Sequence, residues 1–365
     1  MERLGSLEGC GRCLRHHRVI GYESSCIGVK EKPVLEHGGS VRKVARELGV
    51  DPKNWLDLST GINPLGWRVP EIPALVWNRL PENEDGLEDA AKLFYGCRHL
   101  LPAAGSQAII QTLPRLRRGG SVGIVAPTYA EHAHAWRKEG FDVVELEDVS
   151  LSILDQLSVL VVVNPNNPTA RLIPKATLLS WWRRLQAHGG WLVVDEAFMD
   201  ADAGESLSGD TGGEGLLVLR SIGKFFGLAG ARVGFLLGSR TVLEAAQEYL
   251  GPWNVAGPAR WVATAALTDH HWHIETRNSL AHKAQRLTHL LGEHGLIVAA
   301  KTALFQWVPN HDAMSWWERM ARSGVLVRRF DHPRGLRFGL PGDESQWHRL
   351  STVLTSITPD MAHSR

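Results

Sequence analysis

The sequence predicts an α/β protein that has a large, mainly parallel sheet and a smaller α+β domain. Two observations predict it. Between residues 105 and 238, short apolar runs are separated by stretches with helical periodicity. The runs are continuously apolar, as strands of a parallel sheet covered on both faces are, and the alternation with helices is typical of βαβ units. In such a sheet, ligands bind at the carboxyl ends of the strands.

The elements follow from these patterns in chain order. An amphipathic helix is expected over residues 41–48 with Ser40 as its N-cap, then a short strand that breaks into a turn-rich loop over 57–66, and a helix over 86–95. The expected strands of the large sheet are 122–126, 143–146, 159–163, 191–194, 216–219 and 233–237. The expected helices between them are 107–116, 130–138 and 175–187. Strands of the smaller domain are expected at 303–308, 325–328 and 336–338.

The same patterns divide the chain into four parts. Residues 1–32 are expected to be a disordered tail. Residues 33–77 are expected to complete the smaller domain, whose main part is 259–365, and residues 78–258 are expected to form the large ligand-binding domain. The sequence contains no internal repeat, no P-loop and no Rossmann glycine pattern.

Composition narrows the function. The 365 residues include 40 Lys plus Arg and 39 Asp plus Glu, a formal net charge of +1, which argues against nucleic acid as a partner. The hydrophobic share of 44% and the charged share of 22% are ordinary for a globular enzyme. No run approaches the roughly 18 apolar residues that span a membrane, and the first 20 residues lack a secretory pattern. We therefore expect a cytoplasmic protein without a membrane partner.

Three of the four cysteines lie in the predicted tail. Cys10, Cys13 and Cys26, with His16 and His17 beside them, have a spacing that could bind zinc. No second Cys-x-x-Cys pair follows, and the flanking sequence has no periodicity. An unstructured tail without a metal is therefore the preferred interpretation.

Two polar segments lie at expected element ends. Gly105, Ser106 and Gln107 open a helix, where free backbone N–H groups and a hydroxyl could bind an anion. After the strand 159–163, three asparagines and two prolines form a rigid turn over 164–168, which can aim an amide side chain such as that of Asn167.

Two more segments carry charge. Asp195 ends an apolar strand, where a carboxylate is costly to bury unless it meets a cation. Lys224 lies between glycines and aromatic residues, a poorly solvated place that lowers the pKa of an amine. Ser221 and Arg232, on either side of Lys224, can both bind a phosphate.

The order and spacing of these four segments resemble the fold type I pyridoxal phosphate enzymes. The resemblance implies that Lys224 holds the cofactor as a Schiff base, that Asp195 pairs with its ring nitrogen, and that Asn167 donates to its 3-oxygen. It further implies that the cofactor phosphate is held by four residues, Ser106, Gln107, Ser221 and Arg232. Tyr129 would stack on the cofactor ring, although ordinary core packing would also explain it.

Within this fold, the chain resembles the histidinol-phosphate aminotransferase branch, and most of all the threonine-phosphate decarboxylases of cobalamin synthesis, over residues 37–354. Three segments carry this resemblance: 37–39 with 57–66, 195–200, and 251–255. In the second, Phe198 stands where the aminotransferases usually have Tyr. The resemblance implies decarboxylation of O-phospho-L-threonine to (R)-1-amino-2-propanol O-2-phosphate and CO2.

Substrate residues are implied in the same way. Arg337 would bind the carboxylate, and Arg328 would bind the phosphate, although Arg329 could take that place. The other expected substrate contacts are His37, the Gly38 backbone, Gly61 and Asn167. The bond at Cα that lies perpendicular to the cofactor ring is the one that breaks, so the two arginines would select decarboxylation by where they hold the two anions.

Two alternatives stay open: an aminotransferase of the histidinol-phosphate type, and a non-catalytic pyridoxal phosphate-binding regulator. The regulator is disfavoured because Lys224 is present and the tail is too short for a helix-turn-helix. The resemblance also implies a homodimer, but Leu80 replaces the Tyr that usually reaches the partner subunit. Ala170 replaces a Gly of the asparagine turn, and alanine tolerates a positive φ less easily.

Overall fold

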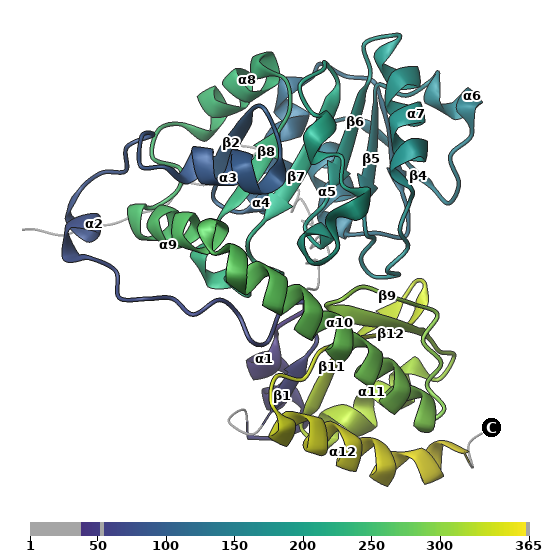
Figure 1. Cartoon of the computed structure of the whole chain (residues 1–365). Coiled ribbons are helices and arrows are strands. Elements are labelled where there is room, and N and C mark those ends of the chain that lie inside the picture. Colours follow the sequence, from purple (N-terminus) through teal and green to yellow (C-terminus); the bar gives the residue numbers. More distant parts are fainter. Residues whose placement is uncertain (1–37, 52–54, 363–365) are drawn as a thin grey trace, which may run out of the picture. The chain divides into compact units, whose positions relative to one another are not determined.

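The computed structural model describes residues 38–51 and 55–362 of the chain, in which two sheets are each covered by helices (Figure 1). The larger sheet has seven strands in the order β2-β8-β7-β6-β5-β3-β4, and the four pairs within β7-β6-β5-β3-β4 are parallel. β2 and β8 are added antiparallel at one edge. The strands are β2 (Leu100–Ala103), β3 (Ser121–Val125), β4 (Asp142–Leu146), β5 (Val159–Val163), β6 (Trp191–Asp195), β7 (Leu216–Ser221) and β8 (Gly234–Leu237).

Helices cover both faces of this sheet, as its apolar strands require. One face carries α4 (Ser106–Thr112), α5 (Ala130–Lys138) and α8 (Arg240–Leu250), whose apolar residues share a core with Val193 and Leu219. The other face carries α3 (Leu87–Tyr95), α6 (Leu151–Leu154), α7 (Lys175–Gln186) and α9 (Gly257–Thr268), which share a core with Leu192 and Val218. Adjacent strand residues thus face two different cores.

The smaller sheet has five strands in the order β1-β11-β12-β10-β9. β1 (Leu56–Leu58) pairs in parallel with β11 (Val325–Asp331), so the N-terminal part of the described chain completes a sheet made of C-terminal strands. The other strands are β9 (Ala300–Lys301), β10 (Phe305–Pro309) and β12 (Arg334–Gly339). The helices of this part are α1 (Val41–Leu48), α10 (His270–Glu293), α11 (Ala313–Arg322) and α12 (Glu344–Ala362), and α2 (Ala74–Asn78) contacts α9.

The predicted α/β architecture is confirmed, and the expected strands of the large sheet are present within two residues of their predicted ends. Ser40 occupies the N-cap position of α1, as predicted. Two details differ. The expected helix 107–116 ends as α-helix at Thr112 and continues as a 3-10 turn, because Pro114 has no N–H to donate. β2 was not predicted, since it has four residues, one of them a proline.

Some expectations lie outside the described residues: the tail 1–32, its Cys and His cluster, and His37. The domain boundaries and the cytoplasmic location stay predictions. Among the described residues, no helix is long and apolar enough to cross a membrane, and no group of three or more His, Cys, Asp or Glu side chains is arranged to hold a metal ion.

Candidate active site

The predicted site residues gather at the carboxyl ends of the central parallel strands. Asp195 is the last residue of β6, Asn167 lies in the turn after β5, and Lys224 lies in the loop 222–228 after β7, which we call the lysine loop. Carboxyl ends of neighbouring parallel strands meet at one edge of a sheet, so segments about 30 residues apart in sequence become neighbours. The sheet order therefore builds the site that the sequence predicted there.

Asp195 is buried and has a partner that the sequence did not reveal. His132 of α5 lies with Nε2 2.9 Å from Asp195 Oδ2, and both side chains are buried. The other carboxylate oxygen accepts a hydrogen bond from the Ala197 N–H at 3.0 Å. These two hydrogen bonds fix the direction of the carboxylate, so it can face a positive ring nitrogen next to it.

Lys224 has an amine of unusually low basicity. Burial lowers the pKa of Lys224 to about 8, and the nearby positive charges of Arg337 and Arg232 add to this, while Asp195 opposes it. The ammonium lies 5.4 Å from the centre of the Phe198 ring. More of this amine is therefore unprotonated near neutral pH than in an ordinary lysine, and the unprotonated form can attack a carbonyl carbon.

A tight backbone cradle lies at the start of α4. Gly105 has a φ of +78°, and a Cβ there would lie 2.6 Å from Arg232 Nη2, so the guanidinium packs directly on the Gly105 backbone. A Cβ on Gly234 would lie 2.5 Å from the Ser106 nitrogen. Gly234 pairs with Ser221 across β7 and β8. The fold thus brings Ser106, Ser221 and Arg232, which are distant in sequence, to one place suited to a phosphate.

Gln107 has a more specific environment than the sequence suggested. Its side-chain amide donates to Glu131 Oε2 at 2.7 Å, and its carbonyl accepts from the Tyr129 hydroxyl at 3.3 Å. The side chain of Gln107 is therefore engaged with α5, which leaves its backbone N–H as the group that could bind a phosphate. The contact also fixes Tyr129, whose phenol pKa is raised to about 12 by burial and by Glu131 and Asp195.

Arg337 links the two sheets and is buried. Its guanidinium donates through Nη1 to Asn167 Oδ1 and through Nη2 to the Ser59 carbonyl, the latter at 2.6 Å. Nε is buried and has no hydrogen-bond partner among the described residues. Burial and the nearby Arg328 lower the pKa of Arg337 to about 10. A buried guanidinium with an unused donor and a second cation beside it is suited to bind an anion.

The register of β11 and β12 distinguishes between Arg328 and Arg329. Arg328 pairs directly with Arg337 across the two strands, so the two side chains share one face of the sheet. Arg329 points the other way: it contacts Met314 of α11 and lies 5.8 Å from the centre of the Trp317 ring. Of the two, Arg328 is therefore the one placed beside Arg337.

The two glycines predicted on the substrate side lie in close contacts. A Cβ on Gly38 would lie 2.6 Å from the Ser59 carbonyl oxygen, and a Cβ on Gly61 would lie 2.7 Å from Cε1 of Phe198. Phe198 in turn packs edge-to-face on Phe305 at 5.0 Å. Gly61, Phe198 and Phe305 thus form an apolar wall near Lys224, and no side chain larger than hydrogen fits at residue 61.

Ala170 has the positive φ that alanine tolerates less easily than glycine, as the sequence indicated. Its φ is +56°, in the left-handed region that favours glycine. The turn is held there by the Ala170 N–H, which donates to the Asn166 carbonyl at 2.8 Å, and by the Asn166 N–H, which donates to Arg171. These bonds keep the asparagine turn in place at the cost of a strained alanine.

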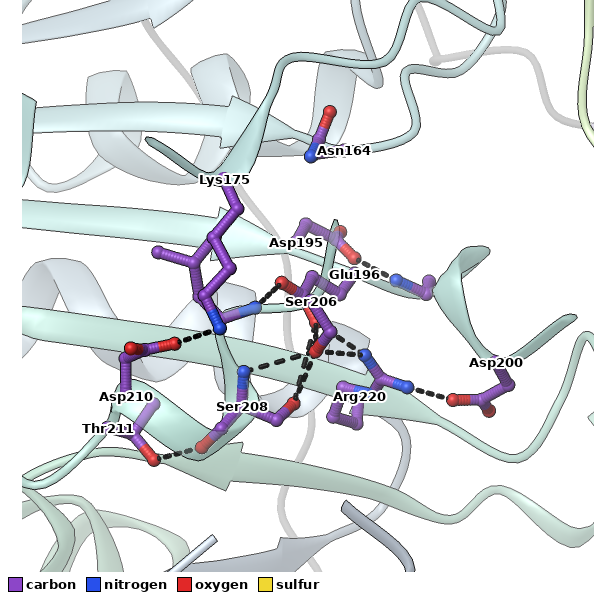
Figure 2. Close-up of polar contacts among 12 residues, drawn as sticks. Asn164, Lys175, Asp195, Glu196, Asp200, Ser206, Ser208, Asp210, Thr211 and Arg220 are labelled. Atoms are coloured by element: carbon purple, nitrogen blue, oxygen red, sulfur yellow. Dashed lines mark hydrogen bonds and ion pairs between the residues drawn. The ribbon is translucent and has the colours of Figure 1, made fainter. Parts of the chain in front are cut away.

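A buried ion cluster lies behind the site and was not predicted (Figure 2). The Arg220 guanidinium donates to Glu196 Oε2 and to Asp200 Oδ1, and all three side chains are at most 2% exposed. Glu196 also accepts from the Ser206 hydroxyl at 2.6 Å and the Leu207 N–H at 2.8 Å. Burial raises the pKa of the Asp200 carboxyl, and Arg220 opposes this.

This cluster lies on the face of the large sheet opposite to the one that Asp195 faces. Successive residues of a strand point to opposite faces. Asp195 therefore contacts His132 of α5, whereas the next residue, Glu196, binds Arg220, which lies 4.6 Å from the ring centre of Tyr95 of α3. On β7, Ser221 likewise follows Arg220 and points to the opposite face. The Arg220–Glu196 ion pair therefore joins the ends of β6 and β7 directly beside the site residues Asp195 and Ser221.

Replacement of Arg220 by alanine should lower the free energy of unfolding by about 3–5 kcal/mol, because it leaves two buried carboxylates without a cation. Urea unfolding at pH 7 measures the change. Arg137→Ala is the control, since it removes an ion pair with Glu145 in which both side chains are about half exposed, and should leave the unfolding midpoint almost unchanged. Equal effects of the two substitutions would show that the cluster does not stabilise the fold.

The residues present fit a cofactor that has an aldehyde, a basic ring nitrogen and a phosphate. Lys224 supplies the amine for the aldehyde, and Asp195 the carboxylate for the ring nitrogen. The cradle of Gly105, Ser106 and Arg232, in which the guanidinium leaves no room for a Cβ on Gly105, suits the phosphate. Pyridoxal phosphate has these three groups. Sequence reasoning missed His132, although its position three residues after Tyr129 places it on the same face of α5.

Comparisons with known proteins agree with this geometry. The sequence profile of the aminotransferase class I and II family matches residues 82–357. The chain is 52% identical over 322 residues to a threonine-phosphate decarboxylase of Pseudomonas aeruginosa, a match that covers 88% of this chain and 97% of that protein. It is 38% identical over 333 residues to a threonine-phosphate decarboxylase of a Sinorhizobium species, with 88% and 98% covered.

A solved structure shows the same fold. The histidinol-phosphate aminotransferase from Sinorhizobium meliloti, in complex with pyridoxal-5'-phosphate, superposes with a TM-score of 0.77 at 17% identity, over 93% of this chain and 98% of that one. The predicted fold type I architecture is thereby confirmed. Since the family profile spans three quarters of the sequence and includes Lys224, Asp195 and Asn167, this chain belongs to the aminotransferase class I and II family.

Proposed function

We propose that this protein uses pyridoxal phosphate to decarboxylate O-phospho-L-threonine, giving (R)-1-amino-2-propanol O-2-phosphate and CO2 for cobalamin synthesis. The observation that carries the proposal is the pair of arginines on adjacent strands, Arg328 and Arg337, next to a weakly basic lysine. Two neighbouring guanidinium groups match a substrate with two anionic groups. The 52% identity to a threonine-phosphate decarboxylase over nearly the whole of that protein supports the same substrate.

When bound, pyridoxal phosphate supplies a conjugated ring that takes up the electron pair released as the Cα–carboxylate bond breaks. The roles of the chain's own residues follow from their positions. Asp195, oriented by His132, would hold the ring nitrogen in its charged form, and Ser106, Ser221 and Arg232 would bind the phosphate. Asn167, whose Oδ1 accepts a hydrogen bond from Arg337, would contact the 3-oxygen of the cofactor through its side-chain N–H.

The arginines would decide which bond at Cα reacts. Arg337 is fixed by two hydrogen bonds, and its Nε has no partner within the part of the chain that the structure describes, so a carboxylate bound to Nε would have a defined direction. Arg328 beside it would hold the substrate phosphate, with the Gly38 backbone nearby. Holding both ends fixes rotation about the substrate's Cα. Lys224 Nζ is still partly protonated near pH 8, and its ammonium form would be the group suited to return a proton to Cα after CO2 has left.

The apolar wall separates this proposal from the aminotransferase alternative. Phe198 presents no hydroxyl beside Lys224, and Gly61 and Phe305 close the space behind it. The deciding experiment is incubation of the purified protein with pyridoxal phosphate and O-phospho-L-threonine in the absence of a 2-oxo acid. Stoichiometric CO2 and a phosphorylated amino alcohol would support the decarboxylase. Amino transfer from histidinol phosphate to 2-oxoglutarate without CO2 would replace it by the aminotransferase.

We further propose that the protein acts as a homodimer. Four large apolar side chains near the amino end of α9 are 60–64% exposed: Leu75, Trp77, Leu80 and Trp253. α2, which carries two of them, lies against the first residue of α9, where a Cβ on Gly257 would be 3.0 Å from the Val76 carbonyl. Exposed apolar side chains gathered in one region are typical of a protein interface. Sedimentation velocity of the wild type and of Trp77→Glu would test whether this surface is covered by a second copy.

A further inference from the structure

The segment 59–67, which we call the strap, leaves β1 and runs along the lysine loop. It binds three successive carbonyl groups of that loop. The Asn63 N–H donates to the Lys224 carbonyl at 3.0 Å, the Asn63 side-chain amide donates to the Phe225 carbonyl at 2.9 Å, and the Trp67 N–H donates to the Phe226 carbonyl at 2.8 Å. The backbone of Lys224 is therefore held by a segment about 160 residues away in sequence.

The strap and the lysine loop touch through their backbones. Gly227 has a φ of +69°, and a Cβ there would lie 2.5 Å from Gly66 Cα. A Cβ on Gly66 would lie 2.9 Å from the Phe226 carbonyl oxygen. Glycines at both positions allow this close approach, so at residues 66 and 227 the strap backbone lies directly on the loop backbone.

Asn63 is buried, with 4% of its surface exposed, and both ends of its amide are satisfied. Its nitrogen donates to Phe225, and its oxygen accepts from the Leu65 N–H at 3.0 Å. Asparagine supplies a donor and an acceptor at this length, whereas aspartate supplies only acceptors. The residue at this position is therefore specified by the lysine loop on one side and by the strap on the other.

The two ends of the strap are also fixed. At its start, the Ser59 carbonyl accepts from Arg337 Nη2 at 2.6 Å, and the Ser59 hydroxyl accepts from the Gly39 N–H at 2.8 Å. At its far end, Trp67 Nε1 donates to Asp269 Oδ2 at 3.0 Å, and Asp269 caps α10. One short segment thus contacts Arg337, the lysine loop and the first turn of α10.

We propose that Asn63 is a positioning residue, which sets the place of Lys224 relative to Arg337, and that the strap couples anion binding at Arg337 to the lysine loop. The kinetic part of this proposal rests on the proposed function, because it takes a substrate anion as the ligand of Arg337. The contacts between Asn63 and the lysine loop do not depend on it.

The first test needs no catalysis. In the cofactor-free, full-length protein, Lys224 should react with an amine-labelling reagent along a pH curve with its midpoint near 8, because the neutral amine reacts and burial lowers the Lys224 pKa. Asn63→Ala should move that midpoint upward, towards the ordinary lysine value, since a loosened loop lets water reach the amine. Peptides containing residues 63–67 should also exchange their amide hydrogens at least about tenfold faster.

The second test is kinetic. With pyridoxal phosphate and O-phospho-L-threonine, Asn63→Ala and Asn63→Asp should lower kcat by about 10–100-fold and change KM by less than about threefold. Asn63→Asp keeps the acceptor for the Leu65 N–H and lacks the donor for Phe225, so it isolates the bond to the lysine loop. Addition of O-phospho-L-threonine to the wild type should slow hydrogen exchange in the strap and in the lysine loop together.

Gln306→Ala is the matched control. Gln306 is also a fully buried amide, and it donates to the Ala284 carbonyl at 2.6 Å and accepts from Thr288 at 2.9 Å, within the smaller sheet and α10. It should lower stability as Asn63→Ala does, without moving the Lys224 midpoint. An unchanged midpoint and unchanged exchange in both Asn63 variants would overturn the proposal. A shifted midpoint in a protein that releases no CO2 would instead leave the role of Asn63 standing and reject the proposed reaction.

Discussion

Lys224→Ala should reduce CO2 release from O-phospho-L-threonine by at least about a thousandfold, which corresponds to about 4 kcal/mol of lost transition-state stabilisation. The substitution removes the amine that, in the proposed function, would hold the cofactor covalently and return a proton to the substrate Cα. Alanine cannot replace either role, because its side chain has no amine. Single-turnover and steady-state CO2 measurements would both record the loss.

A chemical readout separates this role from a folding defect. Borohydride reduction fixes a lysine-bound cofactor irreversibly, so intact-mass analysis should show the added mass in the wild type and not in Lys224→Ala. Lys175→Ala is a suitable control, because that lysine pairs with Asp210 at 2.7 Å, away from the lysine loop, and should keep the added mass. A reduced adduct that persists in Lys224→Ala would assign the cofactor to a different lysine.

Arg337→Lys should lower kcat/KM for O-phospho-L-threonine by about a hundredfold, or about 2.7 kcal/mol. The guanidinium donates to Asn167 and to the Ser59 carbonyl. Its Nε has no hydrogen-bond partner among the described residues and would bind the substrate carboxylate in the proposed function. A lysine ammonium at this depth offers a point charge without the planar fork, so it cannot keep all three contacts. The loss should fall mainly on KM if Arg337 only binds, and on both constants if it also orients the carboxylate.

Arg329→Lys is the control for this experiment, because Arg329 lies on the neighbouring strand β11 and faces α11. It should keep kcat/KM within about threefold of the wild type. If Arg329→Lys reduced activity as strongly as Arg337→Lys, the assignment of strand faces in the smaller sheet would be wrong. Amino-transfer products should be measured in parallel, since a loosely held carboxylate allows a different bond at Cα to react.

The sequence predicted the large sheet well, because its strands are buried on both faces and leave a strong signal. The run 159–163 is β5 residue for residue, and each of its side chains is buried. The site residues at strand ends were predictable for a related reason: a polar residue that ends an apolar run, as Asp195 does, has few explanations. β2 gave no such signal, since Pro102 interrupts four residues that read as a loop.

What the sequence could not show is pairing between distant side chains. His132 and Asp195 are separated by 63 positions, and Arg337 and Asn167 by 170. Nothing local marks these partners. The choice between Arg328 and Arg329 is similar, because a strand pattern fixes that they face opposite sides but not which side faces the site. Only the register with β12 decides it, and register depends on long-range pairing.

The alternation at the ends of β6 and β7 limits how this protein can be altered. Residues 195 and 221 face the site, and their neighbours 196 and 220 form the buried ion pair. Substitutions at 195 or 221 should therefore change the reaction, and substitutions at 196 or 220 should change the stability of the fold. Removal of one residue from either strand would exchange the two roles at once and bring a guanidinium or the longer carboxylate into the cofactor space. Variant libraries aimed at new reactions should therefore vary these positions at constant strand length.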